Sequence, residues 1–309
     1  MPAAERVSHF GLRLEIKLNA FPNHQAAADV AQPELRSPPV LRNLLSLRHL
    51  ARLSRGCPTL TGDTMNPTSA SIEIALRIPG TWAHPGELVE RMPPGCQLSP
   101  EGLILPNGQR VEISPMQPDG QFAKIFSSSC RRPATPDELE MVNRYTVNMG
   151  LLGTGGSLDA VRTMLEAAAV LVQAGGAGVF IDNSGLAHGG EQWLDFAEDG
   201  SVDAMSFAFV SVVRGQTEVW TMGMHVFGLP ELKMRRADIE PTGDLIIDVL
   251  RYMCRSDQPV DKGHVLALED GQILHVTSKA ESEFPAGSPM HNPFGCLFLL
   301  PAREIAERN

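Results

Sequence analysis

The stretch that decides the fold reads Ile72-Glu73-Ile74-Ala75-Leu76-Arg77-Ile78. Its isoleucine and leucine residues alternate with Glu73, Ala75 and Arg77, which is the period of a β-strand with one buried face. We therefore predict a strand over 71–78 and place the start of the folded part near Met65.

Two tight turns predict further antiparallel strands. Asn107-Gly108 tolerates the positive backbone angles of a hairpin turn and lies between the apolar pairs Leu103/Leu105 and Val111/Ile113. Asp270-Gly271 is a second turn of this kind, between strands predicted over 265–269 and 272–277. The pattern also predicts strands over 121–127, 178–182, 205–213, 217–225 and 296–300, and a short one near Leu232.

Helix starts are marked by caps. Thr135 and Glu138 form the capping-box pattern, which predicts a helix running through Tyr145. A longer helix is predicted from Ser157 to the Gly175-Gly176 pair, because its apolar residues recur at three- and four-residue spacing. Two more are predicted over 85–92, with Leu88, Val89 and Met92 facing inward, and over 243–255, with Thr242 as its cap.

The order of these elements is mixed, and hairpins outnumber helices. This predicts an α+β fold of mostly antiparallel sheets with helices packed on one face. One arrangement that it allows is two ferredoxin-like lobes meeting near residue 200.

The first 64 residues differ from the rest in charge. They hold eight Lys/Arg and five Asp/Glu, whereas residues 65–309 hold eighteen and thirty-one. We predict that 1–64 is either a poorly ordered basic leader or a non-native extension upstream of a true start at Met65. The alternative is a basic amphipathic helix over 40–55. Residues 65–309 form the predicted α+β domain.

The net charge of the whole chain limits the kinds of partner that it can attract. The formal net charge is -10, which disfavours phosphate backbones and anionic membranes, so we predict no nucleic-acid and no membrane partner. The five cysteines are scattered and form no C-x-x-C pair, which favours free thiols. No apolar run approaches the ~20 residues of a membrane-spanning helix, and no signal-peptide pattern opens the chain. We predict a cytoplasmic protein.

Candidate catalytic residues follow the strand at 178–182. Asp182, Ser184, His188 and Glu191 lie in the predicted loop after it, together with Trp193. Loops after a buried strand often present catalytic groups, and these side chains suit acid-base work. No G-x-S-x-G elbow is present. The alternative is a polar turn in which Asp182 and Asn183 bond their own backbone and His188 is half exposed.

Two further patterns are weaker. Gly153-Thr154-Gly155-Gly156-Ser157 precedes a helix and could bind a phosphate oxygen, although we favour a turn between two helices. His225, His264 and His275 lie in predicted strands without the spacing of a ligand set. We predict no metal and no cofactor, and expect His225 to be a partly buried histidine bonded to a backbone carbonyl.

The segment from Thr221 to Leu232 contains Gly228-Leu229-Pro230-Glu231-Leu232. With the helix and strand at 160–182 and Ser184-Gly185, it resembles the bacterial family known as domain of unknown function 4261, loosely over residues 70–300. The resemblance implies a bacterial, cytoplasmic α+β protein, and transfers neither catalytic residues nor a cofactor.

Two functions remain open. The favoured one is a non-catalytic module that binds another protein or regulates it, because the body is acidic, strand edges abound and no catalytic signature is complete. The alternative is a hydrolase-like small-molecule enzyme using residues 182–193, with His188 as general base and Glu191 or Asp182 orienting it.

Overall fold

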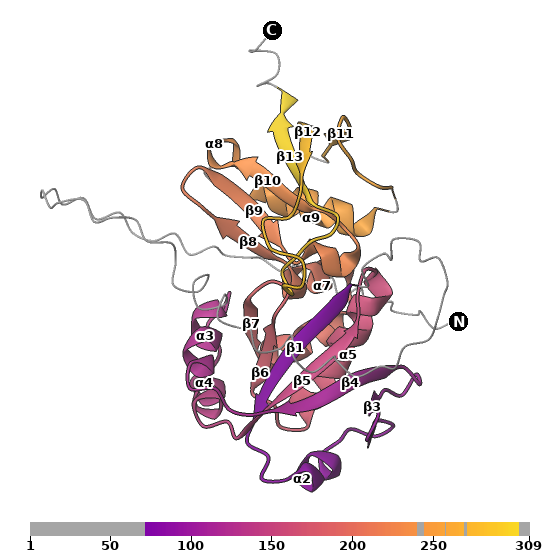
Figure 1. Ribbon diagram of the computed structural model, residues 1–309, viewed down its shortest axis with the longest axis vertical. Helices are drawn as coiled ribbons and strands as arrows, with labels where there is room; N and C mark the ends of the chain where they lie inside the picture. Colours follow the sequence, from indigo (N-terminus) through magenta and orange to yellow (C-terminus); the bar gives the residue numbers. More distant parts are fainter. Residues whose placement is uncertain (1–71, 240–243, 257, 269–270, 303–309) are drawn as a thin grey trace, which may run out of the picture. The chain divides into compact units, whose positions relative to one another are not determined.

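The computed structural model describes residues 72–239, 244–256, 258–268 and 271–302. All of them belong to one compact unit. The predicted leader over 1–64 and the Thr242 cap lie outside the described residues. The described elements form two sheets with helices around them (Figure 1).

The larger sheet has seven strands in the order β2-β3-β4-β5-β1-β6-β7, and every pairing between them is antiparallel. Its strands are β1 (Glu73–Gly80), β2 (Gln97–Ser99), β3 (Gly102–Ile104), β4 (Arg110–Met116), β5 (Val147–Thr154), β6 (Gly178–Ile181) and β7 (Leu186–Gly189).

The smaller sheet has six strands in the order β11-β12-β13-β10-β9-β8. All its pairings are antiparallel except that of β10 with β13. Its strands are β8 (Ser211–Arg214), β9 (Glu218–Met222), β10 (Glu231–Arg235), β11 (Val265–Ala267), β12 (Ile273–Ala280) and β13 (Cys296–Pro301).

The helices connect and cover these strands. They are α2 (Pro85–Glu90), α3 (Phe122–Ser129), α4 (Pro136–Asn143), α5 (Leu158–Gln173), α6 (Gly190–Asp199), α7 (Val202–Phe209), the 3-10 turn η2 (Met224–Phe227), α8 (Arg236–Ile239) and α9 (Asp244–Arg255). The α+β class with mostly antiparallel sheets is confirmed.

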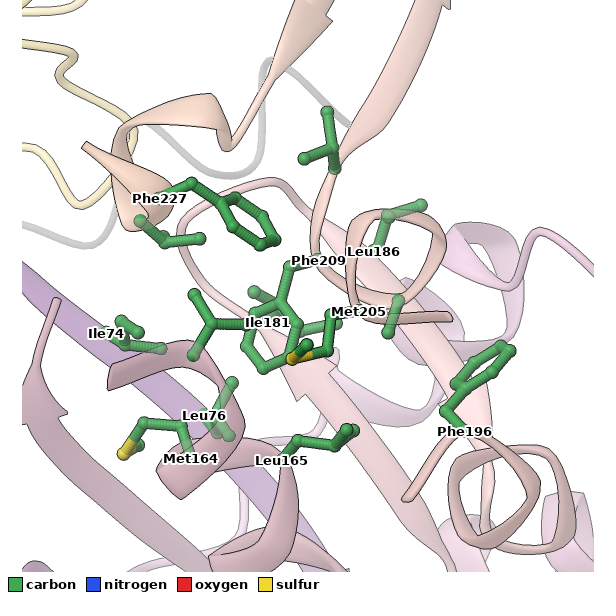
Figure 2. Packing of buried hydrophobic residues seen from close by; sticks show 14 of the residues in the cluster. Ile74, Leu76, Met164, Leu165, Ile181, Leu186, Phe196, Met205, Phe209 and Phe227 are labelled. Carbon is green, nitrogen blue, oxygen red and sulfur yellow. The ribbon is translucent and has the colours of Figure 1, made fainter. Parts of the chain in front are cut away.

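Strand β1 lies inside the larger sheet, as its alternation predicts. Ile74, Leu76 and Ile78 are at most 1% exposed and pack with Met164 and Leu165 of α5 (Figure 2). Helix α5 joins β5 to β6, which flank β1 on either side. This is the split β-α-β connection of ferredoxin-like folds. The parallel neighbours β10 and β13 depart from that pattern in the smaller sheet.

Helices cover both faces of the larger sheet, whereas the sequence predicted one. Phe180 of β6 points away from α5, and its ring meets Phe122 of α3 at a centroid distance of 5.8 Å. Figure 1 shows α3 and α4 on one side of this sheet and α5 on the other.

One hydrophobic cluster continues from the larger sheet into the smaller one. Leu76 of β1, Phe209 of α7 and Phe227 of η2 all belong to it (Figure 2). The chain passes between the sheets through α6 and α7. Two lobes meeting near residue 200 stay a prediction.

Several local predictions are confirmed. The strands around Asn107-Gly108 pair as β3 and β4, and β11 pairs with β12. Thr135 and Glu138 form the capping box of α4. Ser157 caps α5 by accepting a hydrogen bond from the backbone N–H of Ala160.

One predicted strand and the first half of another are helical, whereas residues 211–213 of the second do form a strand, β8. Residues 121–127 fall in α3, because Phe122, Phe126 and Ser129 are buried at helical spacing. Residues 205–209 belong to α7, which Ser201 caps through the backbone N–H of Ala204. Both stretches are short and apolar, and periodicity alone separates strand from helix poorly in such runs. Val89 also differs from prediction, since it is 52% exposed.

Candidate functional site

The predicted polar loop after β6 is a hairpin. Asp182, Asn183, Ser184 and Gly185 form the turn, and β7 pairs with β6 over residues 186–189. Asp182, Asn183 and Ser184 are buried, and His188 is 0% exposed. The predicted loop is therefore a buried turn followed by a strand, and the alternative of a half-exposed His188 is wrong.

Asp182 pairs with Arg77 of β1. The Nε of Arg77 donates to Oδ2 of Asp182 at 2.9 Å, and both side chains are 9% exposed. Burial raises the pKa of the Asp182 carboxyl, and the Arg77 guanidinium opposes this shift. A buried ion pair of this kind holds the end of β6 to β1, and its loss would leave one charge without a partner.

His188 is enclosed by polar and aromatic partners. Its Nε2 lies 2.9 Å from the carbonyl oxygen of Ala208, and its Nδ1 lies 3.1 Å from Oε1 of Gln192. Its ring also meets Phe196 edge-on at 5.2 Å. Burial lowers the pKa of His188 to about 4.

A neutral imidazole donates from one nitrogen only, so these two acceptors cannot both be satisfied. The Nε2 of Gln192 is buried without a hydrogen-bond partner among the described residues. Exchanging the amide oxygen and nitrogen of Gln192 resolves both problems. His188 then donates from Nε2 to Ala208 and accepts from Gln192 at Nδ1.

The four catalytic candidates are not joined to one another, and the hydroxyl of Ser184 is buried without a hydrogen-bond partner among the described residues. The hydroxyl of Ser211 donates to the carbonyl oxygen of Ser184 at 3.1 Å, and the backbone N–H of Glu191 donates to Glu138 at 2.9 Å. Within the described ranges, no hydrogen bond or ion pair joins two of Asp182, Ser184, His188 and Glu191. General-base catalysis by His188 stays a prediction, without a carboxylate against the imidazole.

A polar junction between the sheets involves residues that sequence reasoning did not combine. The side chain of Asn183 accepts from the backbone N–H of Ala75 at 2.9 Å and donates to the carbonyl oxygens of Glu73 and Pro289 at 2.9 and 3.1 Å. Nε2 of His225 lies 3.0 Å from the same Pro289 oxygen. His225 is bonded to a backbone carbonyl, as expected, but it is fully buried at 2% exposure and lies in η2 and not in a strand.

Glu231 completes this junction. Its carboxylate accepts from the Thr221 hydroxyl at 2.7 Å, from the backbone N–H groups of Gly223 and Met224 at 3.0 and 3.1 Å, and from the Asn292 amide at 2.9 Å. So many donors indicate a carboxylate that shapes the backbone around η2. In the sequence, only the Gly-Leu-Pro-Glu-Leu stretch drew attention to Glu231.

The glycine-rich segment 153–157 follows a strand and not a helix, so the predicted turn between two helices is wrong. Two of its backbone donors are taken within the protein. Gly155 donates to the carbonyl oxygen of Ile72 at 2.8 Å and Gly156 to that of Val226 at 2.8 Å. Gly228 approaches Gly156 so closely that a Cβ at Gly228 would lie 2.6 Å from the Gly156 oxygen. The segment therefore brings two backbones together, which only glycine allows here.

The described residues hold neither a metal centre nor a membrane-spanning helix. None of these residues form a group of three His, Cys, Asp or Glu side chains able to hold a metal ion. No described helix has the length and apolar character needed to cross a membrane.

An open hollow of about 530 Å³ lies between α3 and α4. Its lining includes Lys124, Ser127, Ser128, Leu139 and Asn143. None of the predicted catalytic residues lines it.

The smaller sheet has one buried face and one partly exposed face. The inner face carries Val219, Leu232, Leu274, Leu297 and Leu299, all at most 3% exposed and part of the hydrophobic cluster. The strand register places the opposite set on the other side, which we call the outer face: Val213, Glu218, Trp220, Lys233, Arg235, Phe298, Leu300, His275, Val265 and Ile273.

Exposure on the outer face rises toward β11. Trp220, Phe298 and Leu300 are half-buried, whereas Val265 is 53% and Ile273 is 45% exposed. The helices α8 and α9 do not cover this face, since Ile239 and Ile246 join the cluster on the inner side.

Lys233 lies at the centre of the outer face. Its Nζ lies 5.7 Å from the Trp220 ring centroid and 5.3 Å from that of Phe298, so it contacts both π-systems. It also pairs with Glu283 and, at 3.4 Å, with Glu218. Burial lowers the pKa of Lys233, but the two carboxylates outweigh burial and raise it overall.

Comparison with known proteins adds one finding. No curated protein and no solved structure matches the chain significantly. Residues 220–289 match the family described as Domain of unknown function (DUF4261), and this segment supplies η2, β10, α8, α9, β11, β12 and most of β9. The chain therefore carries, over residues 220–289, the DUF4261 family match that its Gly-Leu-Pro-Glu-Leu stretch predicted.

Proposed function

We propose that this protein is a non-catalytic binding module that docks another protein on the outer face of the smaller sheet. The observation that carries the proposal is a row of apolar side chains on that face, with Val265 and Ile273 about half exposed. Exposed apolar side chains rimmed by polar ones mark interaction sites in proteins.

The composition of the face supports a protein partner. Aromatic side chains are enriched where proteins dock, and Trp220 and Phe298 present partly exposed rings on neighbouring parts of one sheet. Strands also hold these side chains rigidly, so little conformational entropy is lost on docking.

The hydrolase alternative gains no such support. It depends on Asp182, Ser184, His188 and Glu191, and among the described residues no hydrogen bond or ion pair joins two of them. A general base needs to lie within hydrogen-bond reach of the proton that it removes, and His188 is enclosed.

The test places a photo-crosslinking amino acid at Ile273 in the cells that make the protein. A matched control places it at Val89, which is 52% exposed on α2. We expect a protein adduct from position 273 and none from position 89. Equal adducts from both positions, or none from 273 while the protein remains folded, would overturn the proposal.

A further inference from the structure

We infer that the partner docks through an extended segment that pairs with β11 and so lengthens the six-stranded sheet by one strand. This inference rests on the proposed function and specifies which kind of segment binds, at the exposed end of the outer face. Strand β11 is an edge of the smaller sheet and pairs with β12 alone (Figure 1). A sheet edge recognises an extended chain through its backbone groups.

The backbone of β11 presents hydrogen-bonding groups on its open side. The N–H of Val276 in β12 donates to the carbonyl oxygen of His264 at 2.9 Å, so the backbone groups of His264 face β12. Along an antiparallel pair, residues that bond the neighbouring strand alternate with residues that do not. The N–H and C=O groups of Val265 and Ala267 therefore point away from β12. No described residue bonds these groups from the open side.

Exposed apolar side chains accompany these backbone groups. Val265 is 53% and Ile273 is 45% exposed, and they are two of the four large apolar side chains that are exposed in the described part of the chain. The other two, Val89 and Tyr252, lie apart from each other on α2 and α9. A strand added to β11 therefore covers apolar surface and also satisfies backbone donors and acceptors.

The other edge strands of the two sheets are β2, β7 and β8, and they are less open. All residues of β7 are buried, and Ala187 also forms a bridge with Cys130. Gln97 is the exposed residue of β2, and Arg214 is that of β8. In β11 two of the three residues are exposed. An extended partner therefore finds the most accessible backbone at β11.

The size and the charge of this edge define the segment that fits it. Strand β11 has three residues, and an extended chain advances about 3.4 Å per residue, so the paired part is about 10 Å long. This suits a short segment, whereas two folded proteins in a stable complex bury about 800 Å² each. The net charge of -10 repels acidic chains, a second copy included. The segment is therefore short, neutral or basic, and places an apolar side chain beside Val265.

The first experiment keeps the photo-crosslinking amino acid at Ile273, in the cells that make the protein, and changes the backbone of β11. Ala267→Pro removes an N–H that faces away from β12, so the hairpin keeps its own hydrogen bonds. Proline is tolerated on the open side of edge strands for this reason. The adduct with another protein should fall about tenfold, because one acceptor of the bound segment loses its donor. Ala267→Val keeps the N–H, is the matched control, and should give the wild-type yield.

A second measurement decides the question even if Ala267→Pro unfolds the chain, which circular dichroism would show. The photo-crosslinking amino acid is placed at Val265 in one variant and at Ala267 in another, and mass spectrometry locates each adduct in the partner. Both side chains lie on the same face of β11, because alternate residues of a strand share a face. Their adducts should therefore map to partner residues about two positions apart in one segment. Adducts in unrelated parts of the partner would contradict strand pairing.

The outcomes separate this inference from the proposed function. If folded Ala267→Pro gives as much adduct with another protein as the wild type does, strand pairing is overturned and the proposed function stands. An adduct with a second copy of the chain also overturns the inference. If position 273 gives no adduct, or one only within its own chain, both are overturned.

Discussion

In both sheets the side chains of each strand alternate between two faces, but the sheets differ in what covers the second face. In the larger sheet even Arg77, on the face opposite Leu76, is only 7% exposed, because α3 and α4 cover that face. In the smaller sheet Leu297 and Leu299 are buried, while Phe298 and Leu300 between them remain half-buried. An alternating strand is therefore buried on both faces or stays partly exposed on one, according to the elements packed on its second face.

The largest expected effect tests this difference with two tryptophans. Trp193 is 0% exposed and donates from its ring nitrogen to the Leu165 carbonyl oxygen at 3.1 Å. Trp193→Ala should lower the free energy of unfolding by about 3–5 kcal/mol. Trp220→Ala, on the outer face, should cost about 1 kcal/mol. Urea denaturation measures both, and equal losses would mean that the outer face is also core.

A smaller effect depends on pH and tests the burial of His188 in the larger sheet. The folded pKa of His188 is about 4, against 6.5 for an ordinary histidine. In this pH range His188 binds a proton in the unfolded chain but stays neutral in the folded one. The free energy of unfolding should therefore fall as the pH drops from about 6.5 to about 4, by about 3 kcal/mol at most.

Denaturation curves across this window check the expectation. His188→Gln should flatten the pH dependence, because it removes the group that titrates. His264→Gln, at an exposed position, is the matched control and should keep the slope. If the free energy of unfolding of His188→Gln still depends on pH in this range, another titrating group causes the dependence.

The smallest effect concerns the helices that seal the larger sheet. Glu138 accepts hydrogen bonds from the backbone N–H groups of Thr135 and Glu191, so one carboxylate caps both α4 and α6. Glu138→Ala should cost about 1–2 kcal/mol. Glu140→Ala, where the side chain is 62% exposed, should cost less than about 0.5 kcal/mol. Thermal unfolding of the pair measures the difference, and similar melting temperatures would contradict the double cap.

Local signals predicted elements whose cause lies within a few residues. The alternation of 72–78, the Asn107-Gly108 turn and the Thr135 box all determine backbone geometry by themselves. Helices α3 and α7 were missed because short apolar runs take helix or strand form according to what they pack against. Phe122 is buried against Phe180, which is distant in sequence.

The candidate site was less predictable for the same reason. The residue types at 182–191 suggested chemistry, but burial decides what they can do, and it depends on distant elements. His188 is closed off by Ala208 of α7, a stretch predicted as a strand. The outer face became visible only from the register of the strands, since β13 joins β12 and β10 across long connections.

The Asn183 side chain also bears on the order of folding. It bonds Ala75, 108 residues before it, and Pro289, 106 residues after it. Contacts over such separations form late, because the entropy of closing long loops is lost before they form. During synthesis the larger sheet can assemble early, but this bond waits until residue 289 has left the ribosome. The closing of the polar junction is therefore one of the late steps of folding.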